Sequence, residues 1–68
     1  MINSKKPWLS RREREVAHNL AEGHSYQAIA DKLHVSLNTV RFHVKNIYRK
    51  LEVHNKAQII RMVLKGEL

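Results

Sequence analysis

Residues 25–51, SYQAIADKLHVSLNTVRFHVKNIYRKL, contain two helical patterns joined by a very short connection. Ser25 and Ser36 each precede a run of apolar residues at helical spacing, and serine is favoured at a helix start because its hydroxyl accepts a hydrogen bond from a free amide. The patterns predict a helix over about 26–33 and a longer one over about 37–51. Two helices this close in sequence are typical of a helix-turn-helix, in which the second helix projects from the body of the domain.

The residues before this stretch predict another helix. Ser10 and Glu13 have the spacing of a capping box, in which the serine hydroxyl accepts from a main-chain amide and the glutamate accepts from the serine amide in return. A helix is therefore expected over about 11–22, and Gly23 stands where a left-handed residue ends many helices. Glu13 is thus assigned a structural role, as a cap or as a partner of a nearby Arg or Lys.

The residues after the stretch predict a last helix. Asn55 is a good N-terminal cap, and a periodic apolar run follows over about 56–65 before Gly66. Because no strand pattern occurs, the predicted fold class is all-α, a four-helix bundle containing a helix-turn-helix. One domain is expected over residues 9–68, preceded by a flexible basic arm over residues 1–8.

The composition narrows the range of functions. The chain has 68 residues, of which 13 are Lys or Arg and 6 are Asp or Glu, so its formal net charge is +7. So short a chain supports one small core and no deep substrate cleft, and the absence of cysteine excludes disulfides and thiolate metal sites. No apolar run reaches the roughly 18 residues of a membrane span, and a cytoplasmic location is expected. The basic excess predicts a polyanionic partner, either a nucleic acid or an anionic membrane surface.

The predicted helix over 37–51 has two chemically different sides. At about 100° per residue, its apolar residues form one stripe that a core can bury. The opposite side, which we call the basic ridge, collects Asn38, Arg41, Phe42, Lys45 and Arg49. In a DNA major groove, Arg and Lys donate to guanine, Asn pairs with adenine, and an aromatic ring contacts the methyl group of thymine. The residues of the basic ridge are therefore the candidates for reading bases.

A third sector of the same helix is expected to face DNA phosphates and holds Thr39, His43, Asn46 and Lys50. The helix starts at Ser25 and Ser36 are further phosphate candidates, because a helix N-terminus attracts anions. No Asp or Glu occurs between Lys32 and Leu51. Since solvated helix faces usually mix charges of both signs, a binding surface is favoured over an ordinary solvated face.

A pattern of residues at fixed spacing extends over most of the chain: Leu9-Ser-Arg-Arg-Glu-Arg-Glu-Val16, Gly23, Ile29-Ala30, Val35-Ser36, Thr39-Val40, His43-Val44-Lys45, Ile47 and Lys50-Leu51. It resembles the LuxR/GerE-type DNA-binding domain, which serves as the C-terminal effector domain of bacterial response regulators and occurs in stand-alone GerE-like regulators. The resemblance implies sequence-specific binding of double-stranded promoter DNA in transcriptional regulation. It also implies that the third helix reads the major groove and that the fourth joins two subunits on paired half-sites.

By the same resemblance, the start of the second helix, at Tyr26 and Gln27, lies near the DNA backbone. RNA polymerase and an N-terminal receiver or sensor domain are the further partners that the family implies, and no cofactor is implied. Glu52 replaces the family's usual Gly, which predicts an altered or strained backbone before the last helix. Lys56 replaces an Arg, so a phosphate contact there would come from a point charge in place of a planar fork.

The predicted last helix carries more apolar residues than one small core can cover. Ile59, Met62 and Val63 are therefore predicted to form a weak homodimer contact, stabilised when DNA holds both copies. The alternative is that these side chains are simply exposed, since scattered apolar residues are common on protein surfaces.

Other classes of function are less well supported by the sequence. A sigma-factor region-four-like promoter-binding module shares the helix-turn-helix but does not require an apolar last helix. A basic amphipathic helix can also bind an anionic membrane surface, yet the apolar stripe of residues 37–51 is expected to be buried in the core. No metal site or enzyme activity is predicted, because the five His residues lack the spacing of a ligand pair and no phosphate loop or nucleophile motif occurs. His34 is expected to adopt a left-handed backbone in the turn.

Overall fold

The computed structural model describes residues 9–68, so the basic arm predicted for residues 1–8 lies outside the described residues. Its helices are α1 (Arg11–Ala21), α2 (Tyr26–Leu33), α3 (Leu37–Leu51) and α4 (Lys56–Leu64), and the described part of the chain contains no strand. The predicted all-α fold with a helix-turn-helix is confirmed. The helix starts agree with the prediction, whereas α1 and α4 each end a single residue earlier than predicted.

Each described helix begins at its predicted cap. The side chains of Ser10, Ser25, Ser36 and Asn55 all accept a hydrogen bond from the main-chain amide three residues later. At α1 the capping box is complete, because the Ser10 amide donates to the Glu13 carboxylate over 2.9 Å and the Glu13 amide donates to the Ser10 hydroxyl over 3.0 Å. Each such cap satisfies an amide that the helix itself leaves free, and stabilises the fold by about 1 kcal/mol.

Left-handed residues end the helices. They are Gly23 (φ 91°), His34 (φ 61°), Glu52 (φ 56°) and Gly66 (φ 75°). The predictions for Gly23 and His34 are confirmed. Glu52 adopts the conformation that suits the glycine usual at its position, and this conformation costs a residue with a side chain about 1–2 kcal/mol. The strain predicted between α3 and α4 therefore lies at Glu52.

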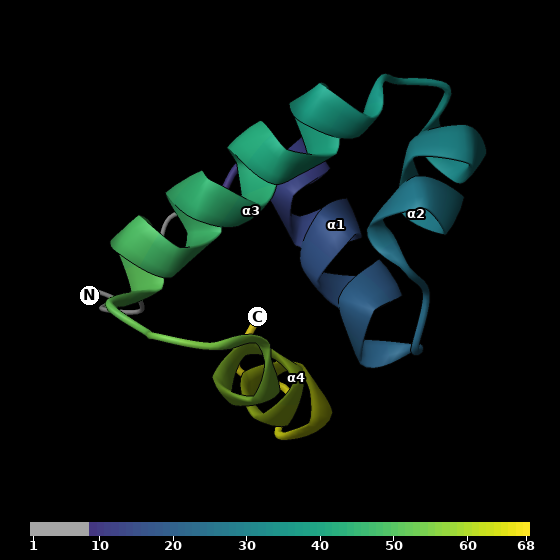
Figure 1. The fold of residues 1–68 in the computed structure, drawn as a ribbon. Coiled ribbons are helices and arrows are strands. Elements are labelled where there is room, and N and C mark those ends of the chain that lie inside the picture. The colour runs from purple at the N-terminus through teal and green to yellow at the C-terminus, as the bar shows by residue number, and fades with distance from the viewer. Residues whose placement is uncertain (1–8) are drawn as a thin grey trace.

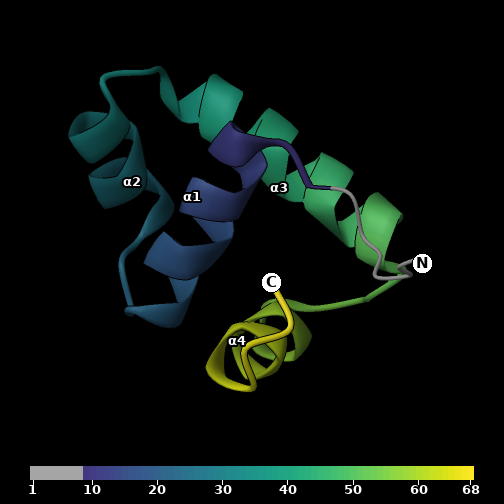
Figure 2. The same ribbon diagram turned by 180° about the vertical axis from the view of Figure 1, so that it is seen from behind.

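Helix α1 forms the centre of the molecule and packs against α2, α3 and α4 (Figures 1 and 2). The core between these helices consists of buried apolar side chains from every helix and from the residue before the α1 cap: Leu9, Val16, Ala17, Leu20, Ile29, Ala30, Val40, Val44, Ile47 and Ile59. At about 25 cal/mol per Å² of apolar surface removed from water, this burial is the main force that holds the short helices in place.

The structure corrects one residue of the predicted homodimer contact. Ile59 is 0% exposed and belongs to the core, where it anchors α4. Its side chain is therefore not available to a second copy of the chain. The wheel alone could not separate this position from its apolar neighbours, because it assigns directions around one helix and not the location of the helix that packs on it.

Helix α3 runs along one edge of the molecule (Figures 1 and 2). Its inner side contacts α1 and α2, while no helix of the described residues 9–68 covers its outer side. Within residues 9–68, no helix combines the length and the apolar character needed to cross a membrane.

Candidate nucleic-acid interface

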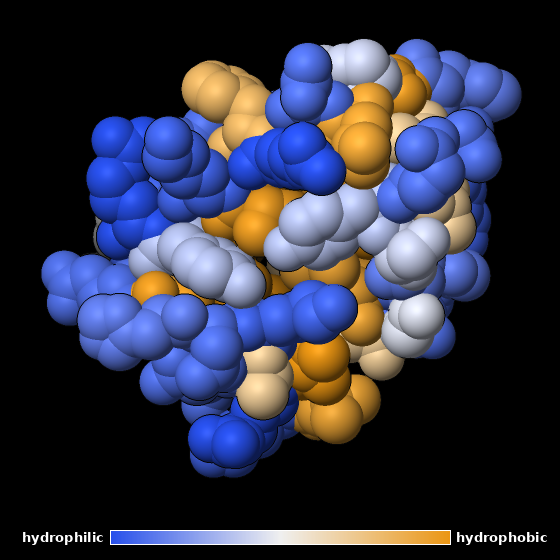
Figure 3. Space-filling view, in the orientation of Figure 1, coloured by the Kyte–Doolittle hydropathy of each residue, from blue (hydrophilic) through white to orange (hydrophobic). Residues whose placement is uncertain are grey.

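The basic ridge of α3 points away from the core. All of its residues are exposed, namely Asn38, Arg41, Phe42, Lys45 and Arg49. The opposite side of the helix, with Val40, Val44 and Ile47, is buried. Burial of the apolar stripe thus fixes the rotation of α3 about its own axis, and this rotation directs the ridge into solvent. In Figure 3, most side chains at the outer edge of the molecule along α3 are hydrophilic, with an apolar group among them.

Phe42 is the apolar member of the ridge and is 60% exposed. Its ring meets the half-buried His43 ring edge to face, with the ring centres 5.8 Å apart. A large aromatic ring gains free energy when a partner covers it, so Phe42 is the candidate for an apolar contact from the ridge. His43 has its Nδ1 buried without a hydrogen-bond partner among residues 9–68.

The C-terminal half of the ridge borders an open hollow of about 870 Å³. Phe42, Lys45 and Arg49 line it on α3, together with Val53 and His54 from the connection to α4. The helical pattern did not include this connection among the candidates, because the periodicity of a helix says nothing about where the chain goes after the helix ends. The hollow extends the basic ridge toward α4.

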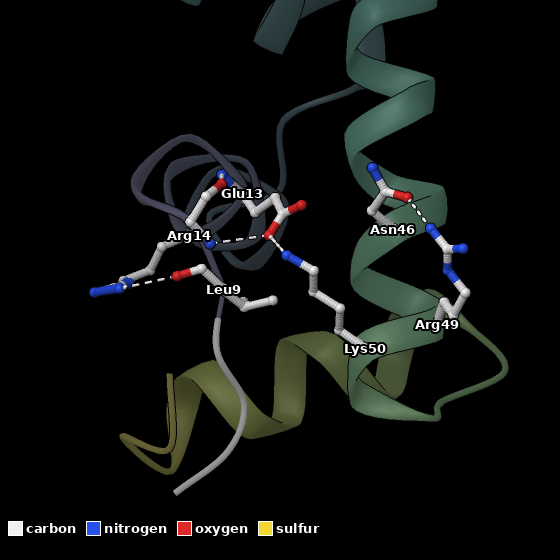
Figure 4. A network of polar contacts seen from close by, with 7 residues as sticks. Leu9, Glu13, Arg14, Asn46, Arg49 and Lys50 are labelled. Carbon is white, nitrogen blue, oxygen red and sulfur yellow. Dashed lines mark hydrogen bonds and ion pairs between the residues drawn. The ribbon is translucent and has the colours of Figure 1, made fainter.

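Arg49 is held in place by its own helix. Its guanidinium group donates a hydrogen bond to the Asn46 side-chain oxygen, as Figure 4 shows. The predicted base-reading and phosphate sectors are therefore connected at this point, because a residue of one orients a residue of the other. An arginine that is already oriented loses less side-chain entropy when it binds.

The helix starts at Ser25 and Ser36 have the geometry of anion sites, but part of their polar groups is used internally. The Ser36 hydroxyl accepts from the Thr39 amide over 3.0 Å and lies 2.9 Å from the Thr39 hydroxyl. Gln27 donates to Asp31 over 3.1 Å, while Ser25 caps α2. The remaining first-turn amides of α2 and α3 are the groups left for a phosphate.

Two phosphate candidates from distant parts of the sequence meet at the start of α2. The Lys56 ammonium lies 5.7 Å from the centre of the Tyr26 ring, a cation–π distance. Burial raises the pKa of the neighbouring Tyr48 hydroxyl, and its proximity to Tyr26 adds to the shift, so Tyr48 stays a neutral donor. The starts of α2 and α4 and the last turn of α3 thus form one surface.

Lys50 differs from the other phosphate candidates, because its ammonium group is paired inside the molecule. Lys50 Nζ lies 2.8 Å from Glu13 Oε1 (Figure 4). The Glu13 side chain is nearly buried, at 7% exposure, whereas the Lys50 side chain is 39% exposed. Burial by itself would raise the pKa of Glu13, but hydrogen bonds from Lys50 and Ser10 and the charge of Lys50 outweigh it and hold the pKa below its ordinary value of 4.5.

The exposed residues of α4 are of mixed character, namely Lys56, Ala57, Arg61 and Leu64. Met62 and Val63 are half-buried, and Leu64 is 75% exposed. Apolar side chains gather over α4 in the lower part of Figure 3. Leu64 was not among the predicted contact residues, although it lies on the same apolar run, because the wheel gave no reason to prefer it over Ile59.

The described residues offer no group of three or more His, Asp or Glu side chains placed to hold a metal ion. The candidate site consists of basic, amide and aromatic groups. Groups of these kinds are able to hydrogen-bond to bases and phosphates and to cover apolar base surfaces.

Comparison with known proteins identifies relatives. Residues 7–63 match the GerE family model, described as "Bacterial regulatory proteins, luxR family". The chain is 42% identical over 62 residues to the probable transcriptional regulatory protein NarL of Mycobacterium tuberculosis (strain ATCC 25618 / H37Rv), which covers 91% of the chain and 29% of that protein. It is also 42% identical over 52 residues to the response regulator protein VraR of Staphylococcus aureus (strain NCTC 8325 / PS 47), covering 76% of the chain and 25% of that protein.

A solved structure shares the fold. The crystal structure of the response regulator ChrA, from a heme-sensing two-component system, superposes with a TM-score of 0.81 and 35% sequence identity. The match covers 96% of this chain and 33% of the ChrA chain. The chain spans less than a third of the length of the curated relatives NarL and VraR.

Proposed function

The chain belongs to the luxR family of bacterial regulatory proteins, and from this premise we propose that it binds double-stranded promoter DNA in a sequence-specific way through α3. The family's helix-turn-helix domains act in transcription regulation, which implies DNA binding for this chain. We further propose that the basic ridge reads bases in the major groove and that the starts of α2 and α3 bind phosphates. Helix α4 joins two copies of the chain.

The exposure of the whole basic ridge is the observation that carries the proposal. A major groove about 12 Å wide accepts one α-helix, provided that the side of the helix facing the bases is not covered by the protein. Helix α3 meets this condition, because its apolar side is buried and its outer side is free of other helices. Arg41 lies in the N-terminal half of α3 and Lys45 near its middle. In helix-turn-helix domains the N-terminal part of the second helix contacts the base edges.

The phosphate contacts follow from the same docking. Thr39, His43 and Asn46 flank the ridge and are half-buried. The first turns of α2 and α3 offer free amides, and Lys56 beside Tyr26 adds a cation. Such contacts carry little sequence information but set the register of the helix in the groove and make binding sensitive to salt.

We assign the subunit contact to the half-buried Met62 and Val63 and to the exposed Leu64 of α4, although Val63 also packs against the core. These side chains remain partly or largely exposed after the core has formed. A small apolar contact of this kind is weak in free solution and becomes effective when DNA holds two copies at high local concentration. Relatives named response regulators support the proposal that the domain works within a response regulator. A receiver or sensor domain beside it, and RNA polymerase as a further partner, are proposed from the family resemblance.

An anionic membrane surface is the less supported target. The apolar residues that a membrane helix would insert, Val40, Val44 and Ile47, are buried in the core. Only Phe42 would remain for lipid on the exposed side of α3. The structure therefore favours a groove over a bilayer.

Selection of bound sites from random duplex DNA at controlled salt tests the proposal. We expect an enriched half-site, present in two symmetric copies, and an affinity that falls steeply between about 50 and 200 mM salt. Vesicles with anionic headgroups serve as the matched polyanion control. Vesicle binding without enrichment of any DNA sequence would contradict the proposal.

A further inference from the structure

The Glu13–Lys50 contact connects the first turn of α1 to the last turn of α3, 37 positions apart in the sequence. It is the one ion pair that joins α3 to another helix within residues 9–68. Lys50 reaches from α3 toward α1, whereas Arg49 leaves α3 on its other side toward Asn46 (Figure 4). The two neighbouring cations thus have different partners.

Resting on the proposed function, we propose that Lys50 is a positioning residue, whose ion pair with Glu13 fixes the C-terminal half of α3 and with it Lys45 and Arg49. In this assignment the Lys50 ammonium serves the carboxylate of Glu13 and not a DNA phosphate. The proposal changes the role that the helical wheel predicts for Lys50.

Burial decides which anion holds the ammonium group. Glu13 is the buried charged residue of the described part of the chain. If Lys50 turned to a phosphate, it would leave a desolvated carboxylate without its counter-charge, and an uncompensated buried charge is strongly unfavourable. A DNA phosphate that Lys50 does not contact stays in water with its mobile counter-ions, so the missing contact costs it much less free energy than the missing pair costs Glu13. Lys50 therefore gains more from remaining at Glu13.

The same carboxylate oxygen also belongs to the cap of α1. Glu13 Oε1 accepts from the Ser10 amide over 2.9 Å and from Lys50 Nζ over 2.8 Å. Leu9, the residue before the cap, is buried in the core, and its carbonyl accepts from Arg14 over 3.2 Å. The end of α3 is thus attached to a rigid, capped helix start and not to a loop.

The Glu13–Lys50 pair lies at the end of α3 that is otherwise least constrained, so it affects the orientation of the basic ridge. The start of α3 is constrained by the short turn after α2, and its middle by Val40 and Val44 in the core. The last turn is followed by the strained Glu52 and the connection to α4. An anchor at Lys50 therefore limits the swing of the end of α3 that carries Arg49.

The Glu13→Gln/Lys50→Met double variant separates positioning from phosphate contact. It removes both charges, so neither is left buried alone; Gln has the shape of Glu, and Met keeps most of the apolar stem of Lys. With Lys65→Met, an exposed lysine beyond α4, as the matched control, DNA affinity is measured over a range of salt concentrations. The double variant is expected to bind about threefold or more weakly with an unchanged slope of log affinity against log salt, and the control is expected to change neither.

A slope that falls by about one in Lys50→Met, or native affinity in the folded double variant, would overturn the positioning role. Carbon-detected NMR titration of the Glu13 carboxyl group in the unbound chain tests the pair without DNA. Its midpoint is expected to lie below 4.5 in the native chain and to rise in Lys50→Met. An unshifted midpoint in Lys50→Met would overturn the pair itself. Absence of DNA binding by the native chain would instead overturn the proposed function, and the titration keeps these failures apart.

Discussion

Helices α3 and α4 both bury apolar side chains in the core, but they differ in the side chains that they leave exposed. In α3 the apolar stripe is buried and the exposed side is polar and basic, apart from Phe42. In α4 only Ile59 is fully buried, and apolar side chains extend around to the outer side, where Leu64 is 75% exposed. Since a short chain has one small core, it covers one stripe per helix and leaves the surplus of α4 in solvent. The two helices therefore expose different side chains, basic and polar ones on α3 and a mixture that includes the apolar Leu64 on α4.

The largest expected effect tests the buried side of α4. Ile59→Ala removes a fully buried side chain and is expected to lower the free energy of unfolding by about 2–5 kcal/mol, which is comparable with the whole stability of so small a domain. Urea denaturation followed by circular dichroism measures it. Met62→Ala, half-buried on the same helix, is the matched control with a smaller loss. A negligible effect of Ile59→Ala would mean that the Ile59 side chain is exposed, and would contradict its place in the core.

The next effect tests the exposed side of α3. Arg41→Ala and Lys45→Ala are each expected to weaken binding to the selected site by about 1–3 kcal/mol and to relax the preference for one base, because each removes donors to a base edge. Fluorescence anisotropy with the selected site and with single-base variants measures both quantities. Lys65→Ala is the control, because it removes one positive charge, as the other two variants do, at a position away from the basic ridge. Equal losses in all three variants would mean that bulk charge, and not the ridge, determines binding.

The outer side of α4 is tested by Leu64→Asp. A charged residue at this exposed position is expected to weaken binding to paired half-sites about tenfold and to leave binding to a single half-site unchanged, because it affects only the contact between two copies. Gel-shift titrations on the two DNA lengths measure this difference. Unchanged binding to paired half-sites would assign the surplus apolar surface of α4 to simple exposure.

The joint between the two helices is tested by Glu52→Gly. Glycine adopts the left-handed backbone without a side-chain clash, but it also gains freedom in the unfolded chain, so a net stabilisation of about 0.5–1 kcal/mol is expected. Thermal and urea unfolding measure the change, with Glu67→Gly as a control outside the helices. A destabilised Glu52→Gly variant would show that the Glu52 side chain makes a contribution larger than its backbone strain.

The smallest effect concerns the attachment of α3 to α1 in acid. Because the folded chain holds the pKa of Glu13 below 4.5, this carboxylate stabilises the fold above that pH, and the contribution is lost as the pH falls through the folded-state pKa. Unfolding at a series of pH values below about 4.5 is expected to show a shallower loss of stability in Glu13→Gln than in the native chain. Glu15→Gln, at an exposed position on the same helix, is the control. Identical acid profiles in the native chain and Glu13→Gln would contradict the pairing of Glu13 with Lys50.

Local features of the fold were predictable because they depend on residues three or four positions apart. The caps at Ser10, Ser25, Ser36 and Asn55 and the left-handed residue His34 were predicted from their neighbours alone. The basic ridge was predictable for the same reason, since the helical period places its residues on one side of α3. Its use in reading DNA bases stays a prediction that the experiments above test.

Contacts between distant residues were not predictable in this way. Helical spacing placed Ile59 with the subunit contact and Lys50 with the phosphate contacts, whereas the fold buries the former and pairs the latter with Glu13. The cation–π contact between Lys56 and Tyr26 was not predictable for the same reason. Each depends on how two helices lie against each other, and the periodicity of a single helix does not contain that information.

The amino-acid sequence by itself determined the number and starts of the helices, the helix-turn-helix, the family and the basic, acid-free character of α3. These features follow from short-range hydrogen bonding, helical periodicity and composition. Only the tertiary structure decided which apolar residues of α4 remain outside and which cation of α3 is held by α1. The reason is that burial and ion pairing depend on the positions of neighbouring helices, which are set by the packing of one shared core.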